Sequence, residues 1–169
     1  AVEDRTDVGG RFKDVFILRD VCKAVRAGEK PPVFRAPAAA KHAVAEFLKG
    51  RKPVTITLRE KDKWISRNSQ IDEWRMFAAH LQGLGHDVIV VRDTAKADEP
   101  FTSYSGHCFS TYPEASRNLH IRMALYEAAE ANLFVGNGPA SLAWFSERPW
   151  LMLVPIVEDG DPYWANTPT

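Results

Sequence analysis

The sequence predicts an α/β domain in which helices cover both faces of a parallel sheet. From Val54 onward, short apolar runs rich in β-branched residues alternate with stretches whose apolar residues recur at helical spacing. This order of strand, helix, strand, loop, helix, strand, helix and strand is typical of parallel sheets. A glycine-rich turn at 136–138 also joins a short apolar run directly to a helix that begins with Pro139, as is common at helix N-termini.

Length and composition agree with one ordinary globular domain. The chain has 169 residues, of which 45% are hydrophobic. Lys and Arg together number 22, as do Asp and Glu, so no basic excess points to nucleic acid. No apolar run is long enough for a membrane span, and the start lacks a signal-peptide pattern. Cys22 and Cys108 form neither a disulfide framework nor a zinc-site spacing, which favours a reduced, cytoplasmic setting.

We expect four segments along the chain. Residues 1–30 form a helical segment whose apolar stripe over 12–27 would come from the end of an N-terminal domain or support self-association. Residues 31–53 form a linker and a helix, 54–157 the sheet domain, and 158–169 a polar tail. Because the chain starts with Ala rather than Met, both a fragment and a processed product stay open.

Each predicted helix and strand follows from a local pattern in the sequence. The helix that starts at Pro37 buries a stripe at helical spacing and ends at Gly50. Its expected buried residues are Ala40, Val44, Phe47 and Leu48. The predicted strands are 54–58, 87–91, 133–135 and the buried strand 150–154. The predicted helices are 71–83, 113–131 (buried through Leu119, Met123 and Tyr126) and 140–146. The polar loop 94–111 leaves a short strand or a turn open.

Polar residues follow three of these strands directly. They are Arg59, Arg92 with Asp93, and Asn137 with Gly138. Because ligands of parallel α/β sheets bind beyond the carboxyl ends of the strands, we expect these residues to share one rim of the sheet. Arginine offers a planar fork to phosphate oxygens, and a glycine turn at a helix start offers backbone N–H groups. A diphosphate held between the two loops is the predicted ligand.

The basic residues after the first strand differ in how strongly they support a phosphate-binding site. They are Arg59, Lys61, Lys63 and Arg67. The position of Arg59 directly at the strand end favours a functional role. The two lysines are more typical of a solvated loop in which they pair with neighbouring carboxylates.

Several other residues allow more than one interpretation. Asp93 would bind ribose or a nucleobase edge, or cap a turn. Asn137 and Ser141 would donate to phosphate, or Asn137 would only tolerate an unusual turn. The glycine turn itself would bind an anion or only allow close packing. Trp64 and Tyr104 would stack on a sugar or a base.

Other chemistries have little support in the sequence. The five histidines are dispersed, and none pairs with Cys or a carboxylate at a metal-ligand spacing. No P-loop is present, and Ser141 is not in a G-x-S-x-G elbow. His107 with Glu114 is the one acid–base pair left for a hydrolase or an epimerase.

Three segments together resemble the C-terminal, nucleotide-sugar-binding half of GT-B glycosyltransferases. They are KPVTITLREKDKWISRNSQIDEW, DVIVVRDT and NLFVGNGPASLAWFSERPWLML. TLREKDK is similar to the histidine-x-arginine-arginine-x-aspartate-lysine motif of fucosyltransferases that use GDP-fucose, and NGPASLA is similar to the glycine-proline helix start of heptosyltransferases. The segment KPPVFRAPAAAKHAVAEFLKGRKP resembles the linker between the halves, so the likeness spans about residues 30–155.

The resemblance implies a Rossmann-like fold and a metal-independent, inverting transfer of sugar from a nucleoside-diphosphate sugar to an acceptor hydroxyl, without a cofactor. Arg59 would contact the donor pyrophosphate and stabilise the leaving nucleoside diphosphate. The resemblance also implies a second domain, absent from this chain, that carries the catalytic base. The positions implied for donor binding are Arg67, Asp93, Asn137, Gly138 and Ser141.

This sequence departs from the family pattern at three places. Thr57 replaces the histidine and Glu60 the second arginine of the fucosyltransferase motif. Met123 and Ala124 stand where those enzymes place an acidic residue for the nucleobase. These departures argue against GDP-fucose as the donor. A non-catalytic binding module with the same fold remains the alternative, and in that case the rim residues would point apart or pair among themselves.

Overall fold

The computed structural model describes residues 23–30, 33–62 and 65–153. The chain divides into two compact units, 1–32 and 33–169. In the first unit residues 23–26 are helical, whereas most of the helix predicted over 12–27 lies outside the described residues. The predicted tail 158–169 also lies outside them. No helix in the described ranges is long and apolar enough to span a bilayer.

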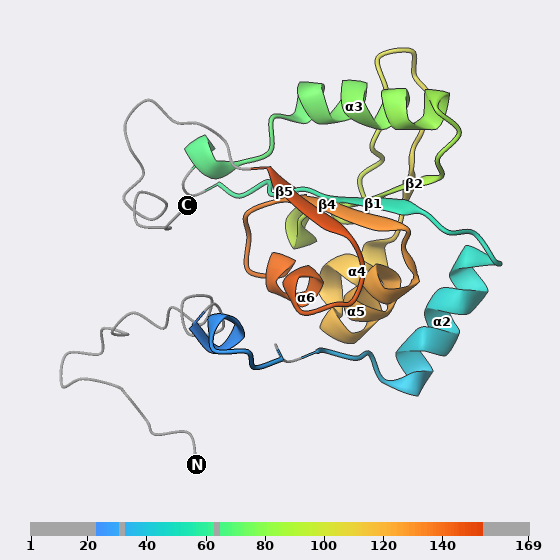
Figure 1. Ribbon diagram of the computed structural model, residues 1–169. Helices are drawn as coiled ribbons and strands as arrows, with labels where there is room; N and C mark the ends of the chain where they lie inside the picture. The colour runs from blue at the N-terminus through green and yellow to red at the C-terminus, as the bar shows by residue number, and fades with distance from the viewer. Residues whose placement is uncertain (1–22, 31–32, 63–64, 154–169) are drawn as a thin grey trace. The chain divides into compact units, whose positions relative to one another are not determined.

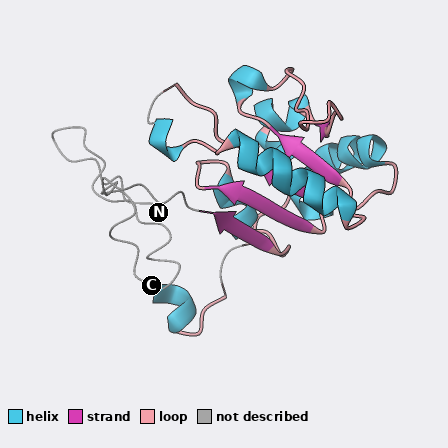
Figure 2. Cartoon of the chain, turned by 90° about the horizontal axis from the view of Figure 1, so that it is seen from above, coloured by secondary structure: helices cyan, strands magenta, loops and turns pink. Residues whose placement is uncertain are grey.

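The second unit is built on a five-stranded sheet in the order β3-β2-β1-β4-β5. All neighbouring strands are parallel, so the strand arrows in Figure 2 run the same way. The strands are β1 (Val54–Thr57), β2 (Val88–Val91), β3 (Ser110–Thr111), β4 (Ala131–Val135) and β5 (Trp150–Leu153). The predicted parallel α/β fold is therefore confirmed, and β3 is the short strand left open within the loop 94–111.

Helices cover both faces of this sheet (Figure 1). On one face lies α3 (Ile71–Gly83), whose Trp74 and Ala78 pack on alternate residues of β1 and β2, such as Ile56 and Val90. The other face carries the remaining α-helices of this unit. They are α2 (Ala38–Leu48), α4 (Pro113–Arg117), α5 (Leu119–Ala128) and α6 (Ala140–Trp144). The four residues of β1 and of β2 are all buried because both faces are covered.

The core facing α2 and α5 forms largely as the sequence predicts. Ala40, Val44 and Leu48 of α2 are buried, and they join Ile89 and Val91 of β2 in one apolar cluster. Two hydrogen bonds satisfy the polar side chains buried in the sheet: Thr55 Oγ1 to Asn132 Oδ1 at 2.7 Å and Thr57 Oγ1 with the Tyr126 hydroxyl at 2.7 Å. These bonds tie β1 to β4 and to α5, which fixes the strand that leads to Arg59.

The single helix predicted over 113–131 is wrong, because the chain forms two helices there. Asn118 has extended backbone angles (φ −124°, ψ 113°), and its Oδ1 accepts from the N–H groups of His120 and Ile121. It therefore ends α4 and caps α5, a role that asparagine favours. The helix also ends at Ala128, so Ala131 belongs to β4. Leu119 is 58% exposed because it is the first residue of α5, and its expected burial is wrong as well.

The strand predicted at 150–154 forms over Trp150–Leu153, the part of it that the structure describes, but its predicted burial is wrong. Among the strands that the structure describes, β5 pairs with β4 alone and lies at an edge of the sheet. Trp150 packs against Phe134 with ring centroids 5.9 Å apart, yet it remains 45% exposed. Apolar residues alone predict a strand here, but its position at the edge decides its burial.

Candidate functional site at the carboxyl ends of the strands

The sheet topology marks one edge as the place for a ligand. From β1 the chain passes to β2 and β3 on one side, then crosses to β4 on the other side of β1. The loops that leave the carboxyl ends of β1 and β4 therefore diverge at a switch point, where parallel α/β sheets bind ligands. We call the residues that directly follow β1, β2 and β4 the carboxyl rim. The predicted polar residues after these three strands all lie there, as expected for parallel neighbours.

Arg59 lies at this rim, two residues beyond the end of β1. The strand alignment continues past β1, since the N–H of Leu58 donates to the carbonyl of Val91 at 3.0 Å. Arg59 is only 7% exposed, and its Nη1 donates to Asn68 Oδ1. Burial lowers the pKa of Arg59 and the positive charge of Arg67 lowers it further, whereas the carboxylate of Asp93 opposes the shift. The two guanidinium groups thus lie within electrostatic range of each other, and the Asp93 carboxylate offsets part of their repulsion.

Arg67 ends the short 3-10 helix η1 (Ile65–Arg67), which follows the loop after β1. Arg67 comes eight positions after Arg59, and the N–H of Ser69 donates to the Arg59 carbonyl at 2.9 Å, so the chain is back at the rim by Ser69. The role of Arg59 and Arg67 in donor binding stays a prediction. Lys63 and Trp64 lie outside the described residues.

Glu60 and Arg92 form a buried ion pair between the loops after β1 and β2. Arg92 Nε donates to Glu60 Oε2 at 3.1 Å and Nη2 to Oε1 at 2.5 Å. Their side chains are only 3% and 8% exposed, respectively. Burial by itself would lower the pKa of Arg92, but the hydrogen bonds and charge of Glu60, followed by those of Glu99, raise it. This bidentate pair makes the two loops one unit.

Asp93 is held within the same unit. Its carboxylate accepts from the Glu60 N–H at 3.1 Å and the Thr94 N–H at 2.9 Å, and Lys61 Nζ lies 2.7 Å from Oδ1. Burial would raise the pKa of Asp93, but these bonds from Lys61 and the two backbone groups outweigh it and lower the pKa. Asp93 thus caps the 3-10 helix η2 (Thr94–Lys96), one of its two expected roles. Its contact with a substrate stays a prediction.

The turn after β4 is closed by its own side chains. Asn137 Oδ1 accepts from the Ala140 N–H at 2.9 Å, and Ser141 Oγ donates to the Gly138 carbonyl at 2.8 Å. Gly138 is exposed, and a Cβ at that position would meet no atom within 4 Å. Close packing therefore does not require a glycine at position 138. The roles of Asn137, Gly138 and Ser141 in phosphate binding remain predictions.

The remaining candidates from the sequence do not gather at this rim. Tyr104 is 68% exposed in a loop closed by the bridge between Thr102 and Cys108. His107 lies in the same loop and contacts the ring of Phe109, with no contact to Glu114, the first acidic residue of α4. The acid–base pair proposed for a hydrolase or an epimerase is therefore not assembled. Within the described ranges, no three His, Cys, Asp or Glu side chains gather in a way that could hold a metal ion.

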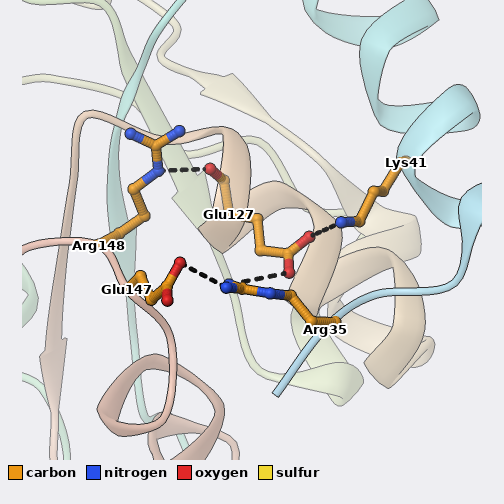
Figure 3. A pocket seen from close by; sticks show the side chains of 5 residues that line it. All are labelled: Arg35, Lys41, Glu127, Glu147 and Arg148. Carbon is orange, nitrogen blue, oxygen red and sulfur yellow. Dashed lines mark hydrogen bonds and ion pairs between the residues drawn. The ribbon is translucent and has the colours of Figure 1, made fainter. Parts of the chain in front are cut away.

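A pocket of about 420 Å³ lies at the opposite end of the strands (Figure 3). Arg148 lies just before β5, and its Nε donates to the Glu127 carbonyl near the end of α5 at 2.7 Å. The Glu127 carboxylate lies 2.8 Å from Lys41 Nζ and 3.9 Å from Arg35 Nη1, and Arg35 also pairs with Glu147. The charged groups that line this pocket mostly satisfy one another, so it is a weaker candidate than the rim.

Sequence reasoning missed the partners that organise the rim. The sequence presents Glu60 as a departure from a motif and as a carboxylate next to the loop lysines, whereas in the structure it pairs with the buried Arg92. No sequence pattern assigns a role to Asn68, yet its side chain contacts both Arg59 and Lys61. The strand register alone places Arg92 beside Leu58, so the contact between Glu60 and Arg92 depends on the path of the loop after β1, which no sequence pattern predicts.

Comparisons with known proteins identify the fold. No family model matches the sequence, and a search of curated proteins likewise finds no match. The solved structures that match the chain include E. coli ADP-heptose LPS heptosyltransferase II, with a TM-score of 0.57 and 13% identity over 79% of this chain. They also include a glycosyl transferase family 9 structure from Veillonella parvula, with a TM-score of 0.55 and 8% identity over 71% of this chain. The chain has a GT-B glycosyltransferase-like fold. It covers only 43% and 36% of those two chains, that is, less than half of each.

Proposed function

We propose that this chain is the nucleotide-sugar-binding part of a glycosyltransferase. It would act on a nucleoside-diphosphate sugar and transfer the sugar to an acceptor hydroxyl in a cytoplasmic setting. The observation that carries the proposal is a buried arginine, Arg59, at the switch point of the sheet, with Arg67 within electrostatic range of it. Both structural neighbours are named as glycosyltransferases, and because the chain covers less than half of each, a further domain that binds the acceptor is part of the proposal.

The chemistry assigned to Arg59 follows from the charge that develops during transfer. As the acceptor oxygen forms its bond to the anomeric carbon on the face opposite the diphosphate, the bond to the diphosphate oxygen breaks and leaves negative charge there. The configuration at the anomeric carbon is inverted. The acceptor hydroxyl loses its proton to a base that we place on a second domain. Arg59 would donate to the diphosphate oxygens, with Arg67 and the turn at Asn137–Ser141 beside it. Cationic side chains would supply this stabilisation without a metal or a cofactor.

A non-catalytic binding module remains the second candidate, and one observation favours it. Asp93, Asn137 and Ser141 form hydrogen bonds with neighbouring groups of the same chain. Such internal pairing is expected of a rim that only packs. The two candidates differ in whether Arg59 is needed for an anionic ligand.

Calorimetric titration of the full chain with GDP, UDP, ADP and CDP separates them. We expect one diphosphate to bind selectively, and we expect Arg59→Ala to weaken it at least tenfold, since a charge-assisted hydrogen bond is worth roughly 1.5–3 kcal/mol. Arg51→Ala is the matched control, because Arg51 is an exposed arginine paired with Asp87 at the other end of the strands. Equal affinity of Arg59→Ala and wild type would refute the role of Arg59, and failure of a folded chain to bind any of the four would favour the non-catalytic module.

A further inference from the structure

Arg122 is a buried arginine in the first turn of α5, and the proposed function gives it no role. It is only 4% exposed, and its Nε donates to the Ala115 carbonyl of α4 at 2.6 Å. Among the residues that the structure describes, no carboxylate lies within ion-pair distance of its guanidinium. Its terminal nitrogens are not among the fully buried polar atoms without a partner in those ranges, so they keep contact with solvent. Arg122 is therefore a buried cation whose tip is accessible.

The contacts of Tyr126 show where the Arg122 side chain lies. Tyr126 follows one turn later on the same face of α5, and its hydroxyl bonds Thr57 Oγ1 at the end of β1 at 2.7 Å. Tyr126 also belongs to one apolar cluster with Phe134 of β4 and Ala140 of α6. This face of α5 is therefore directed at the ends of β1 and β4, the two strands on either side of the switch point.

Arg122 lies nearer to the carboxyl rim than Tyr126. Because α5 leads into the start of β4, it runs opposite to the strands, and its first turn lies at their carboxyl ends. Helical side chains also lean toward the helix N-terminus, which carries the guanidinium further toward the rim. Burial raises the pKa of Tyr126, whereas the positive charge of Arg122 opposes this shift, so the guanidinium acts on the hydroxyl at the end of β1.

The bond to α4 fixes Arg122 against a segment that is itself tied to the rim. Ser116, which follows Ala115, donates through Oγ to the Arg92 carbonyl at 2.8 Å, and Thr94 Oγ1 donates to the Ser116 carbonyl at 3.0 Å. The hydrogen bond from Arg122 Nε to α4 therefore sets the orientation of the guanidinium relative to the loop after β2. Nη1 and Nη2 are then the nitrogens that can donate to a ligand.

This placement of a cation is costly for the folded chain. A buried charge without a counterion loses hydration that nothing replaces. The first turn of a helix is also the positive end of its dipole, which disfavours a cation there. The buried Arg92 of the same rim shows the usual solution, because Glu60 pairs with it through two hydrogen bonds. An anion bound at Arg122 would offset both costs, and a ligand is the anion that the structure leaves room to propose.

We propose that Arg122 is an anion-binding residue of the carboxyl rim, which donates through its Nη atoms to phosphate oxygens of the nucleoside diphosphate. That the phosphate belongs to a nucleoside diphosphate rests on the proposed function, whereas the binding of a phosphate group rests on Arg122 itself. Arg59 comes from the loop after β1 and Arg122 from α5, so the diphosphate would be held by two separate elements at the switch point.

Arg122→Gln tests this role with little disturbance of the fold. Glutamine places its Nε2 where arginine has Nε, so the donor to the Ala115 carbonyl is kept while the Nη atoms and the charge are removed. We expect affinity for the diphosphate and for inorganic pyrophosphate to fall at least tenfold in calorimetry of the full chain. The Tm without ligand should equal or exceed that of wild type, because a buried charge without a counterion is lost. A residue that only joins α4 to α5 predicts unchanged affinity instead.

Arg51→Gln is the matched control, because Arg51 Nε also donates to a backbone carbonyl, that of Leu48 at 3.1 Å. Arg51 is exposed and paired with Asp87, so its substitution should leave affinity unchanged. A second measurement needs no variant that must fold: the Arg122 Nε–Hε signal of wild type should shift in NMR spectra when pyrophosphate is added, while that of Arg51 stays in place. An unmoved Arg122 signal at saturating pyrophosphate would overturn the inference.

The probes, which are ADP, GDP, UDP, CDP and pyrophosphate, keep this inference apart from the proposed function. If a nucleoside diphosphate binds and Arg59→Ala weakens it but Arg122→Gln does not, the role of Arg122 is overturned and the proposed function stands. If pyrophosphate binds through Arg122 but no nucleoside diphosphate binds, Arg122 is confirmed as an anion-binding residue and the proposed function fails. If the folded chain binds none of the probes, both are overturned.

Discussion

Removing the charge of Glu60 should destabilise the protein far more than removing an exposed carboxylate. Glu60 and Arg92 are both nearly buried and make two hydrogen bonds to each other. Glu60→Gln keeps the size of the side chain but leaves the Arg92 charge without its buried counterion. Breaking one side of a buried ion pair costs about 3–5 kcal/mol. Arg92 also contacts the carbonyls of Glu99 and Pro100, at 3.3 and 3.2 Å, so we take the lower end, about 3 kcal/mol.

Urea unfolding followed by circular dichroism and thermal unfolding measure this cost. For a domain of this size, 3 kcal/mol corresponds to a fall in Tm of roughly 6–12 °C. Asp87→Asn is the matched control, because Asp87 makes the same kind of pair with Arg51 at 3.3 Å in an exposed position. That substitution should cost less than about 1 kcal/mol. If Glu60→Gln costs no more than Asp87→Asn, the reasoning that the Glu60–Arg92 pair joins the loops after β1 and β2 is refuted.

Two further predictions concern Asp93 and Asn118. The folded-state pKa of Asp93 lies below its ordinary value of 3.8, so its contribution to stability is complete above that value and is lost as the pH falls through the lowered pKa. The difference in unfolding free energy between wild type and Asp93→Asn should therefore shrink below pH 3.8 in acid titrations, and a constant difference would contradict it. Asn118→Ala should cost about 1 kcal/mol in urea unfolding, because it removes the cap of α5, whereas Asn118→Asp should cost much less. Equal losses for the two variants would show that the cap does not stabilise α5.

The sequence predicts the sheet and the rim because both depend on local patterns. Runs such as Val88–Val91 are β-branched and continuous, and such runs form strands buried on both faces. The alternation of strands with helices then implies parallel pairing, and parallel pairing brings the ends of β1, β2 and β4 to one edge. The position of Arg59 follows from these two steps alone.

The remaining features depend on contacts that a periodicity does not encode. Asn118 interrupts a continuous helical pattern because its side chain competes for backbone N–H groups, an effect of one residue. The apolar run that begins at Trp150 predicts a buried strand, but its exposure depends on whether another strand pairs beyond β5. The roles of Glu60 and Asn68 require knowledge of which loops meet. Such contacts between loops become visible only in the folded structure.

The most direct test of the account is to map where a nucleoside diphosphate binds. Amide chemical shifts of the full chain would be recorded by NMR during titration with the diphosphate that binds best in calorimetry. The account predicts that the largest shifts fall at the carboxyl rim, around Arg59, Ser69 and Gly138, with little change near Glu127 and Arg148. Shifts that instead gather around the pocket at Glu127 and Arg148 would contradict the central claim that the carboxyl rim is the functional site.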